Sequence, residues 1–179
     1  MSTIETTRAA AGTWTLDPVH STVGFEVGYL VGTFKGQFRD VIAQLDVGET
    51  GARLSGSARV ASVDVKDENL AAHLQSPDFF DAETHPELRF SADDFAIEGG
   101  TVTADGEITI KGVTKPVVVT GTVAEPLTDP YGNERIGLAV STTVDRTDFG
   151  VSWNTPLPDG KQALADEVRI VGELAFVKA

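Results

Sequence analysis

The chain has 179 residues, of which 41% are hydrophobic and 23% are charged, and its 27 acidic and 14 basic residues give a net charge of -13. This length fits one domain with a sizeable core, and the acidic balance disfavours nucleic acid and anionic lipid surfaces as partners because their phosphates would repel it. The absence of cysteine excludes disulfides, thiolate nucleophiles and cysteine metal sites.

The N-terminal segment carries Glu5 and Arg8 and lacks the apolar stretch of a signal peptide. We therefore expect a disordered tail over residues 1–11 and a single barrel domain over residues 12–179. No stretch of the chain approaches the roughly 20 apolar residues that a membrane-spanning helix needs, so stable membrane insertion is not expected. The expected compartment is the cytoplasm.

The first long element is predicted over residues 19–31, where apolar and polar or small residues alternate strictly. A period of two over this length indicates a half-buried β-strand with Phe25 and Val27 on its inner face. Phe34 and Phe38 restart the pattern after a short turn, so a returning strand is predicted over residues 33–47. The inward parity switches near Arg39, which predicts a β-bulge within that strand.

The same alternation predicts further strands along the rest of the chain, with a second parity switch at Asp93 and Asp94. These strands are expected at residues 14–17, 53–64, 87–98, 101–111, 116–125, 134–145 and 166–178. One helix is predicted over residues 67–75, with Asp67 as its N-cap. Short hairpin links impose antiparallel pairing, so the predicted fold is an all-β, extended antiparallel up-and-down barrel of about eight strands with one short helical insertion.

The inward positions of this barrel combine an aromatic wall with many small residues, which predicts an apolar cavity that holds a ligand. The alternative is that the glycines relieve coiling strain and large neighbours fill the space. The residues predicted to bind the ligand are Val23, Phe25, Val27, Tyr29, Phe34, Phe38, Phe90, Ala104, Gly106, Ile108, Arg146 and Phe149.

Four segments carry a family resemblance: WTLDPVHSTVGFEV, NLAAHLQSPDFFDAETHPELRF, ADGEITIKGVTKPV and DRTDFGV. Over residues 13–178 the chain resembles the YceI-like family of lipocalin-like polyisoprenoid-binding proteins. The resemblance implies an extended lipocalin-like barrel that binds a long-chain isoprenoid or similar amphiphile, assembles as a homodimer, and brings no cofactor and no catalytic reaction. The chain departs from the family pattern at Gly28 and Tyr29, where a basic residue and His are usual, and in the shorter turn that follows.

Residues that could carry other chemistry have structural alternatives. The three histidines show no metal-ligand spacing, so no metal site is expected. Asp17, His20 and Ser21 suggest a nucleophilic triad, but adjacent strand residues point to opposite faces, and His20 is better interpreted as a polar anchor at a barrel end.

Two further features lie in the connections between strands. Arg146 is interpreted as pairing with Asp148 to hold the loop over residues 146–165, with a ligand head group as the other candidate partner. Phe79 and Phe80 are interpreted as holding the helix to the barrel, with ligand contact as the alternative.

Three functions follow from these patterns. The first is non-enzymatic binding, storage or transport of a long apolar lipid, such as a polyprenyl or isoprenoid quinone species. The second is an enzyme acting on such a lipid, which would need an acid–base cluster inside the barrel. The third is a structural or stress-associated barrel that acts through protein partners.

Strand directions place the long connections 65–86 and 146–165 at one end of the barrel. The mouth of the cavity is therefore predicted between these connections, with Tyr29 lining its throat.

Overall fold

The structure, a computed structural model, describes residues 11–49, 51–98 and 100–179. The tail predicted for residues 1–11 lies, apart from Ala11, outside the described residues. The strands are β1 (Gly12–Leu16), β2 (Thr22–Tyr29), β3 (Gly32–Phe38), β4 (Val41–Val47), β5 (Ala52–Arg59), β6 (Val63–Asp64), β7 (Glu87–Glu98), β8 (Thr101–Ile110), β9 (Val113–Thr128), β10 (Glu134–Asp145) and β11 (Leu164–Lys178). The predicted helix is α2 (Glu68–Gln75).

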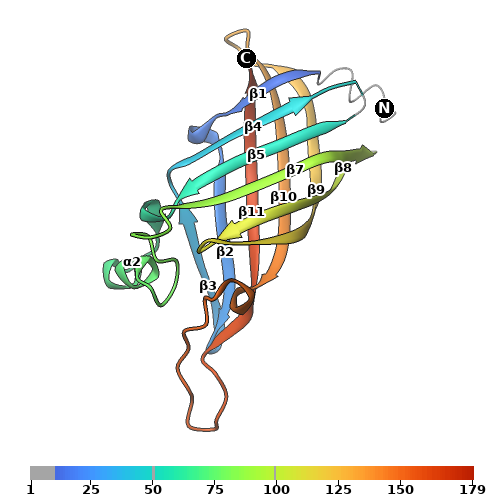
Figure 1. Cartoon of the computed structure of the whole chain (residues 1–179). Coiled ribbons are helices and arrows are strands. Elements are labelled where there is room, and N and C mark those ends of the chain that lie inside the picture. The colour runs from blue at the N-terminus through green and yellow to red at the C-terminus, as the bar shows by residue number, and fades with distance from the viewer. Residues whose placement is uncertain (1–10, 50, 99) are drawn as a thin grey trace.

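All strand pairs are antiparallel, and the sheet closes on itself through β11 (Figure 1). One edge of β11 pairs with β10, and its other edge pairs first with β2 and then with β1. The described residues thus form a closed barrel of eight strand positions with one helix, which confirms the predicted fold class. Hairpin connections account for this topology, because they make each strand pair with the next one along the chain.

Three of the strand positions consist of two segments separated by a break. A 3-10 turn over Pro18–His20 separates β1 from β2, and another over Val60–Ser62 separates β5 from β6. Arg39 and Asp40 separate β3 from β4. The β3–β4 and β5–β6 breaks lie side by side, since the backbone N–H of Arg39 donates to the carbonyl of Ser62 at 3.1 Å.

The first of the two predicted parity switches has a different cause from the one expected. The irregularity predicted near Arg39 is confirmed, but it is a break between Phe38 and Val41 rather than a bulge. On its two sides, β3 pairs with β2 and β6, and β4 pairs with β1 and β5. The predicted irregularity near Asp93 is confirmed by a register shift between Ala92 and Ala96 in the β7–β8 ladder.

The predicted strand over residues 19–31 is shorter at both ends than expected. Val19 lies in the 3-10 turn with 83% of its surface exposed, and Val31 lies in the hairpin turn at 106%. The cause at the first end is local, because Pro18 follows Asp17, whose carboxylate accepts a hydrogen bond from the backbone N–H of Val19.

The end of the barrel built from β1, β4 and the C-terminal part of β11 is filled by side chains. Trp14, Leu45 and Phe176 have no exposed surface. Trp14 lies opposite Leu45 in the β1–β4 ladder, and Leu16 lies opposite Phe176 in the β1–β11 ladder. In Figure 1 this end lies away from α2 and from the loop that precedes β11. The packed end therefore supplies a dry core, because each of these large side chains is removed from water.

Two glycines flank Val140 on its neighbouring strands and differ in the space around them. Gly121 on β9 and Gly172 on β11 both lie opposite Val140. A Cβ on Gly121 would lie 1.9 Å from the carbonyl oxygen of Ala139, so the two backbones approach too closely for a side chain. A Cβ on Gly172 would meet Leu174 at 3.4 Å, which is an ordinary contact.

We therefore expect Gly121→Ala to destabilise the protein by about 1–3 kcal/mol, the usual cost of forced overpacking. Gly172→Ala should change the free energy of unfolding by less than about 0.5 kcal/mol. Urea unfolding followed by circular dichroism measures both. Equal effects of the two substitutions would contradict the backbone approach at Gly121.

Candidate functional site: an apolar cavity at one end of the barrel

The other end of the barrel is hollow. A cavity of about 370 Å³ lies between β2, β3, β10 and β11 on one side and β4, β5 and β7 on the other. Residues from α2, from the segment after it and from the loop before β11 cover its end. The lining is almost wholly apolar, and the volume lies within the roughly 300–1,000 Å³ of small-molecule pockets.

One wall of the cavity is a cluster of phenylalanine rings centred on Phe25. Its ring centroid lies 5.9 Å from those of Phe34 and Phe38 and 6.1 Å from that of Phe80. Phe25 lies opposite Gly36 in the β2–β3 ladder, and a Cβ on Gly36 would come within 2.5 Å of the Phe25 ring. The missing side chain at Gly36 therefore makes room for the Phe25 ring over β3.

The cover over the cavity is held by a second group of rings. α2 begins at Asp67, whose carboxylate accepts a hydrogen bond from the backbone N–H of Leu70 at 3.0 Å, as predicted for an N-cap. The His73 ring lies 4.9 Å from both Phe79 and Trp153, and Phe79 lies 5.4 Å from Trp153. These ring contacts join α2 and the segment after it to the loop that precedes β11.

Phe79 and Phe80 contact the cover and the barrel wall, and ligand contact by them stays a prediction. Both line the cavity. Phe80 contacts Phe25 and Phe38 on the barrel wall, at 6.1 and 5.8 Å between ring centroids. The pair thus holds the helical segment to the barrel and also forms part of the cavity surface.

Arg146 lines the cavity, but its guanidinium is used entirely by the protein. Its N–H groups donate to the backbone carbonyls of Ala165, Val151, Trp153 and Leu164 and to the carboxylate of Asp166, at 2.7–3.4 Å. Arginine has five N–H donors, so none remains for a ligand head group. The ion pair predicted with Asp148 is wrong, because the paired carboxylate is that of Asp166 on β11. Burial lowers the pKa of Arg146 from its ordinary value.

Lys111 holds the connections at this end to one another. Its ammonium donates to the backbone carbonyl of Pro77, after α2, and to that of Gly150, at the start of the loop. Lys111 itself lies in the β8–β9 turn with φ of 51°. Three segments that are distant in sequence are therefore fixed together over the cavity.

Ten of the twelve predicted ligand-binding residues line this cavity, while Ala104 and Gly106 do not. Ala104 belongs to the buried core of the barrel, with 5% of its surface exposed. Gly106 is covered by Phe90, because a Cβ there would lie 3.0 Å from the Phe90 ring and 2.7 Å from the carbonyl of Ser91. Large neighbours therefore occupy the space at these two positions, as the alternative interpretation expected. Ligand contact by the other ten stays a prediction.

Sequence reasoning missed several lining residues. Leu70, His73 and Trp153 come from α2 and the irregular loop, where a two-residue period carries no information. Val140 and Val168 also line the cavity, and their inward parity on β10 and β11 was a signal that could have found them.

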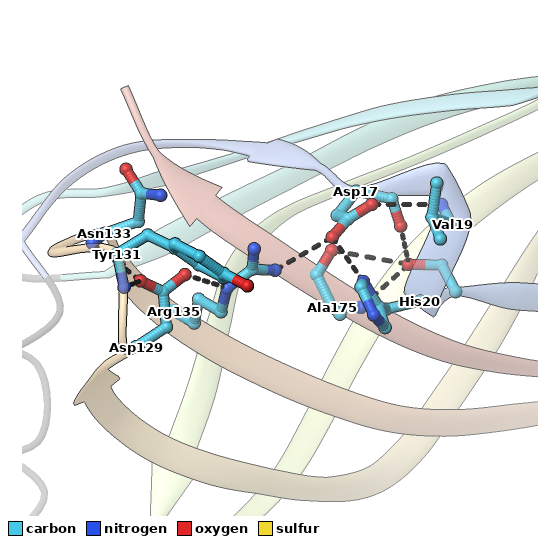
Figure 2. A network of polar contacts seen from close by, with 9 residues as sticks. Asp17, Val19, His20, Asp129, Tyr131, Asn133, Arg135 and Ala175 are labelled. Atoms are coloured by element: carbon cyan, nitrogen blue, oxygen red, sulfur yellow. Dashed lines mark hydrogen bonds and ion pairs between the residues drawn. The ribbon is translucent and has the colours of Figure 1, made fainter.

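The candidate nucleophilic triad does not assemble. The imidazole Nδ1 of His20 lies 2.7 Å from the carboxylate of Asp17, but the Ser21 hydroxyl donates to the backbone carbonyl of Asp17, at 2.7 Å. The same hydroxyl accepts a hydrogen bond from the backbone N–H of Ala175 (Figure 2). His20 lies in the turn between β1 and β2 with 66% of its side chain exposed, rather than at a barrel end, and neither it nor Ser21 lines the cavity.

Asp17 belongs instead to a polar network on the outside of the barrel. Arg135 donates to the carboxylates of Asp17 at 2.8 Å and Asp129 at 2.6 Å (Figure 2). These bonds lower the pKa of Asp17 to about 2, with His20 contributing further. Arg135 and the backbone N–H of Asn133 likewise lower the pKa of Asp129 to about 2. The network joins β10 to the β1–β2 break and to the β9–β10 turn.

A metal site and a membrane-spanning helix have structural requirements that the described residues do not meet. No group of three His, Asp or Glu side chains among residues 11–49, 51–98 and 100–179 could hold a metal ion. Within the same residues, no helix has the length and apolar character needed to cross a bilayer.

Comparison with known proteins identifies the family to which this barrel belongs. A family model described as the YceI-like domain matches residues 14–176. The chain belongs to the YceI-like family. A UPF0312 protein of Pseudomonas fluorescens is 33% identical to this YceI-like chain over 141 residues, which cover 73% of this chain and 71% of the relative.

Two solved structures show the same YceI-like barrel. BcnA of Burkholderia cenocepacia has a TM-score of 0.77 and 25% identity, covering 89% of this chain and 98% of its own. A polyisoprenoid binding domain from Saccharophagus degradans has a TM-score of 0.73, covering 93% of this chain and 98% of its own. At 13% identity the latter likeness concerns the fold alone.

The acid stability of this YceI-like barrel should reflect the Arg135 network. Asp17 and Asp129 have pKa values of about 2 when folded against 3.8 ordinarily, so the folded state binds fewer protons than the unfolded state between these values. Their contribution to stability is therefore complete above about pH 4 and is lost as the pH falls through about 2.

Urea unfolding midpoints measured from pH 2 to pH 5 check this expectation. Arg135→Gln should flatten the pH dependence in that window, because both carboxyls return toward their ordinary pKa. The control is Arg89→Gln, which breaks an exposed ion pair with Glu87 and should leave the wild-type slope. A wild-type slope in Arg135→Gln would contradict the role of the network.

Arg146 should be essential for the order of the cavity cover. Arg146→Lys retains the charge but supplies only three donors for the five acceptors, so at least one of the four carbonyls loses this partner, at about 1–3 kcal/mol. Amides over residues 151–164 should then exchange hydrogen faster. Asp166→Asn keeps the four bonds to carbonyls and should cost less than about 1 kcal/mol, because Asp166 is 62% exposed. Similar losses in the two variants would mean that the ion pair, not the carbonyl bonds, holds the loop.

Proposed function

We propose that the protein binds a long-chain isoprenoid or similar amphiphilic lipid in the hollow end of the barrel and stores or carries it without chemical change. The main support for this proposal is the cavity. Its lining is almost wholly apolar, and the buried guanidinium of Arg146 has no free N–H. Such a surface favours an aliphatic chain over a polar or charged molecule.

The energetics of the cavity support the same ligand class. At roughly 24 cal/mol per Å³, an unfilled apolar cavity of about 370 Å³ costs on the order of 9 kcal/mol. This figure is comparable with the whole stability of a typical domain, about 5–15 kcal/mol. A flexible apolar chain regains these contacts because it can follow an irregular lining.

A non-enzymatic role is supported by the chemistry of the lining. Its titratable side chains are Tyr29, His73, Arg89 and Arg146. No carboxylate belongs to the described lining, and His73 is already hydrogen bonded to Asp78 at 3.0 Å. An acid–base pair at the centre of the cavity, which the enzymatic alternative needs, is therefore not formed by these residues.

Membership of the YceI-like family supports the isoprenoid class, as does the fold shared with the polyisoprenoid binding domain of Saccharophagus degradans. A polyprenyl or isoprenoid quinone ligand, assembly as a homodimer and a cytoplasmic location stay predictions.

The ligand can be identified by solvent extraction of the purified protein followed by mass spectrometry. Val140→Trp should displace it, because Val140 lines the cavity between Gly121 and Gly172. We expect at least a tenfold loss of extracted lipid with circular dichroism unchanged. Gly172→Leu fills the same space from β11 and is the second test if Val140→Trp fails to fold.

The matched control is Thr143→Phe, an exposed position on the same strand with outward parity. It should retain lipid at the wild-type level. Wild-type protein that extracts no lipid and takes up no isoprenoid alcohol from solution would overturn the proposal. Equal lipid retention by Val140→Trp, Gly172→Leu and the control would place the ligand elsewhere.

A further inference from the structure

The tip of the β2–β3 hairpin presents successive apolar side chains to solvent. Tyr29, Leu30 and Val31 have 43%, 56% and 106% of their surface exposed. Tyr29 pairs with Gly32, so Leu30 and Val31 form a two-residue turn. Exposed apolar residues are ordinary when scattered, but three in a row at the end of a projecting hairpin form a patch.

The turn is also unfavourable for the residues it contains. Leu30 has φ of 51°, in the left-handed region that branched side chains rarely adopt. Two-residue hairpin turns normally use Gly, Asn or Asp at such positions. The corresponding turn between β8 and β9 has Lys111 at the position of Leu30, also with φ of 51°, but places a glycine, Gly112, at the position of Val31. The β2–β3 tip therefore carries apolar side chains where local stability and solubility both favour polar ones or glycine.

This tip is continuous with the cavity and with a second apolar projection. Tyr29 is half-exposed and also lines the cavity. The backbone N–H of Leu30 donates to the carbonyl of Ala163 at 2.9 Å, which places the tip beside the loop that precedes β11 (Figure 1). That loop carries Pro156, Leu157 and Pro158 at its turn. Pro156 and Pro158 are exposed and Leu157 is partly exposed, so apolar side chains continue from the cavity lining through the hairpin tip to this turn.

We propose that this end of the barrel, residues 29–31 with residues 156–158, docks on a phospholipid bilayer so that the bound lipid passes between the bilayer and the cavity. The inference rests on the proposed lipid-binding function. Side chains of this size enter the boundary between head groups and acyl chains, with a tyrosine suited to the interface.

The charges near the tip indicate which head-group charge of the bilayer favours docking. Lys35 and Arg169 both pair with Glu26, at 3.5 and 3.4 Å, so they do not form a free cationic patch. In the loop turn, the exposed Lys161 is accompanied by the exposed Asp159, so the turn adds no net charge. The whole chain carries a net charge of -13. Docking is therefore driven by apolar contact with a zwitterionic surface, and anionic lipid should weaken it.

The test uses Leu30→Gly combined with Val31→Ser, which suits the positive φ and removes the apolar tip. This double variant should unfold at the same or a higher urea concentration than wild type. Its co-flotation with phosphatidylcholine vesicles should fall at least about tenfold, because two exposed apolar side chains are lost. Leu127→Ser is the matched control, since Leu127 is 61% exposed on β9 and lies beside the β9–β10 turn.

Transfer of a dansyl-labelled C20 isoprenoid alcohol separates docking from binding. From vesicles, transfer to the double variant should be at least about tenfold slower than to wild type or the control. From dilute ethanol solution, all three proteins should bind the probe with equal affinity. Failure of every protein to bind it from solution would overturn the proposed function, whereas vesicle flotation independent of the tip would overturn this inference alone.

Sedimentation of the proteins without vesicles distinguishes a second copy as the occupant of the tip. If the double variant only converts a dimer to a monomer, and vesicle flotation and transfer equal those of wild type, the tip is a protein interface and the inference is overturned. An unchanged sedimentation coefficient together with lost flotation supports docking on the bilayer.

Discussion

The closure of the barrel along β11 is the constraint on which the rest of the structure depends. This strand runs from the hollow end to the packed end, with β10 on one edge and β2 followed by β1 on the other. Because one continuous strand serves both halves, the aromatic side of the cavity and the dry core around Trp14 and Phe176 share a single hydrogen-bonded frame. The breaks in the first three strand positions let the sheet change direction between these halves without opening it.

The two ends of the barrel use polar groups in different ways. At the packed end, apolar burial supplies the stability, and the Arg135 network lies on the outer surface. At the hollow end, fewer apolar contacts are available, and Arg146 and Lys111 hold irregular segments through backbone carbonyls. These bonds give the cavity a defined cover where hydrophobic packing alone would not.

The sequence predicted the elements that depend on local pattern and missed what depends on tertiary neighbours. Alternation placed Phe25, Phe34 and Phe38 correctly because the two-residue period is a property of the strand itself. The same signal could not distinguish a bulge from a break at Arg39, since both shift the phase. It indicated that Ala104 points inward but not that this position lies in the filled half, and the partner of Arg146 lies 20 residues away on β11.

The division into a packed end and a hollow end has a consequence for how such barrels diversify. Cavity positions such as Val140 and Val168 are only partly buried, whereas Trp14, Leu45 and Phe176 have no exposed surface. Evolution can therefore reshape the lining while the other half preserves the fold. Relatives at 30–33% identity are then expected to share the architecture and to differ more among the residues that line the cavity. The residues that form the packed core and the residues that line the cavity therefore lie toward different ends of the same barrel.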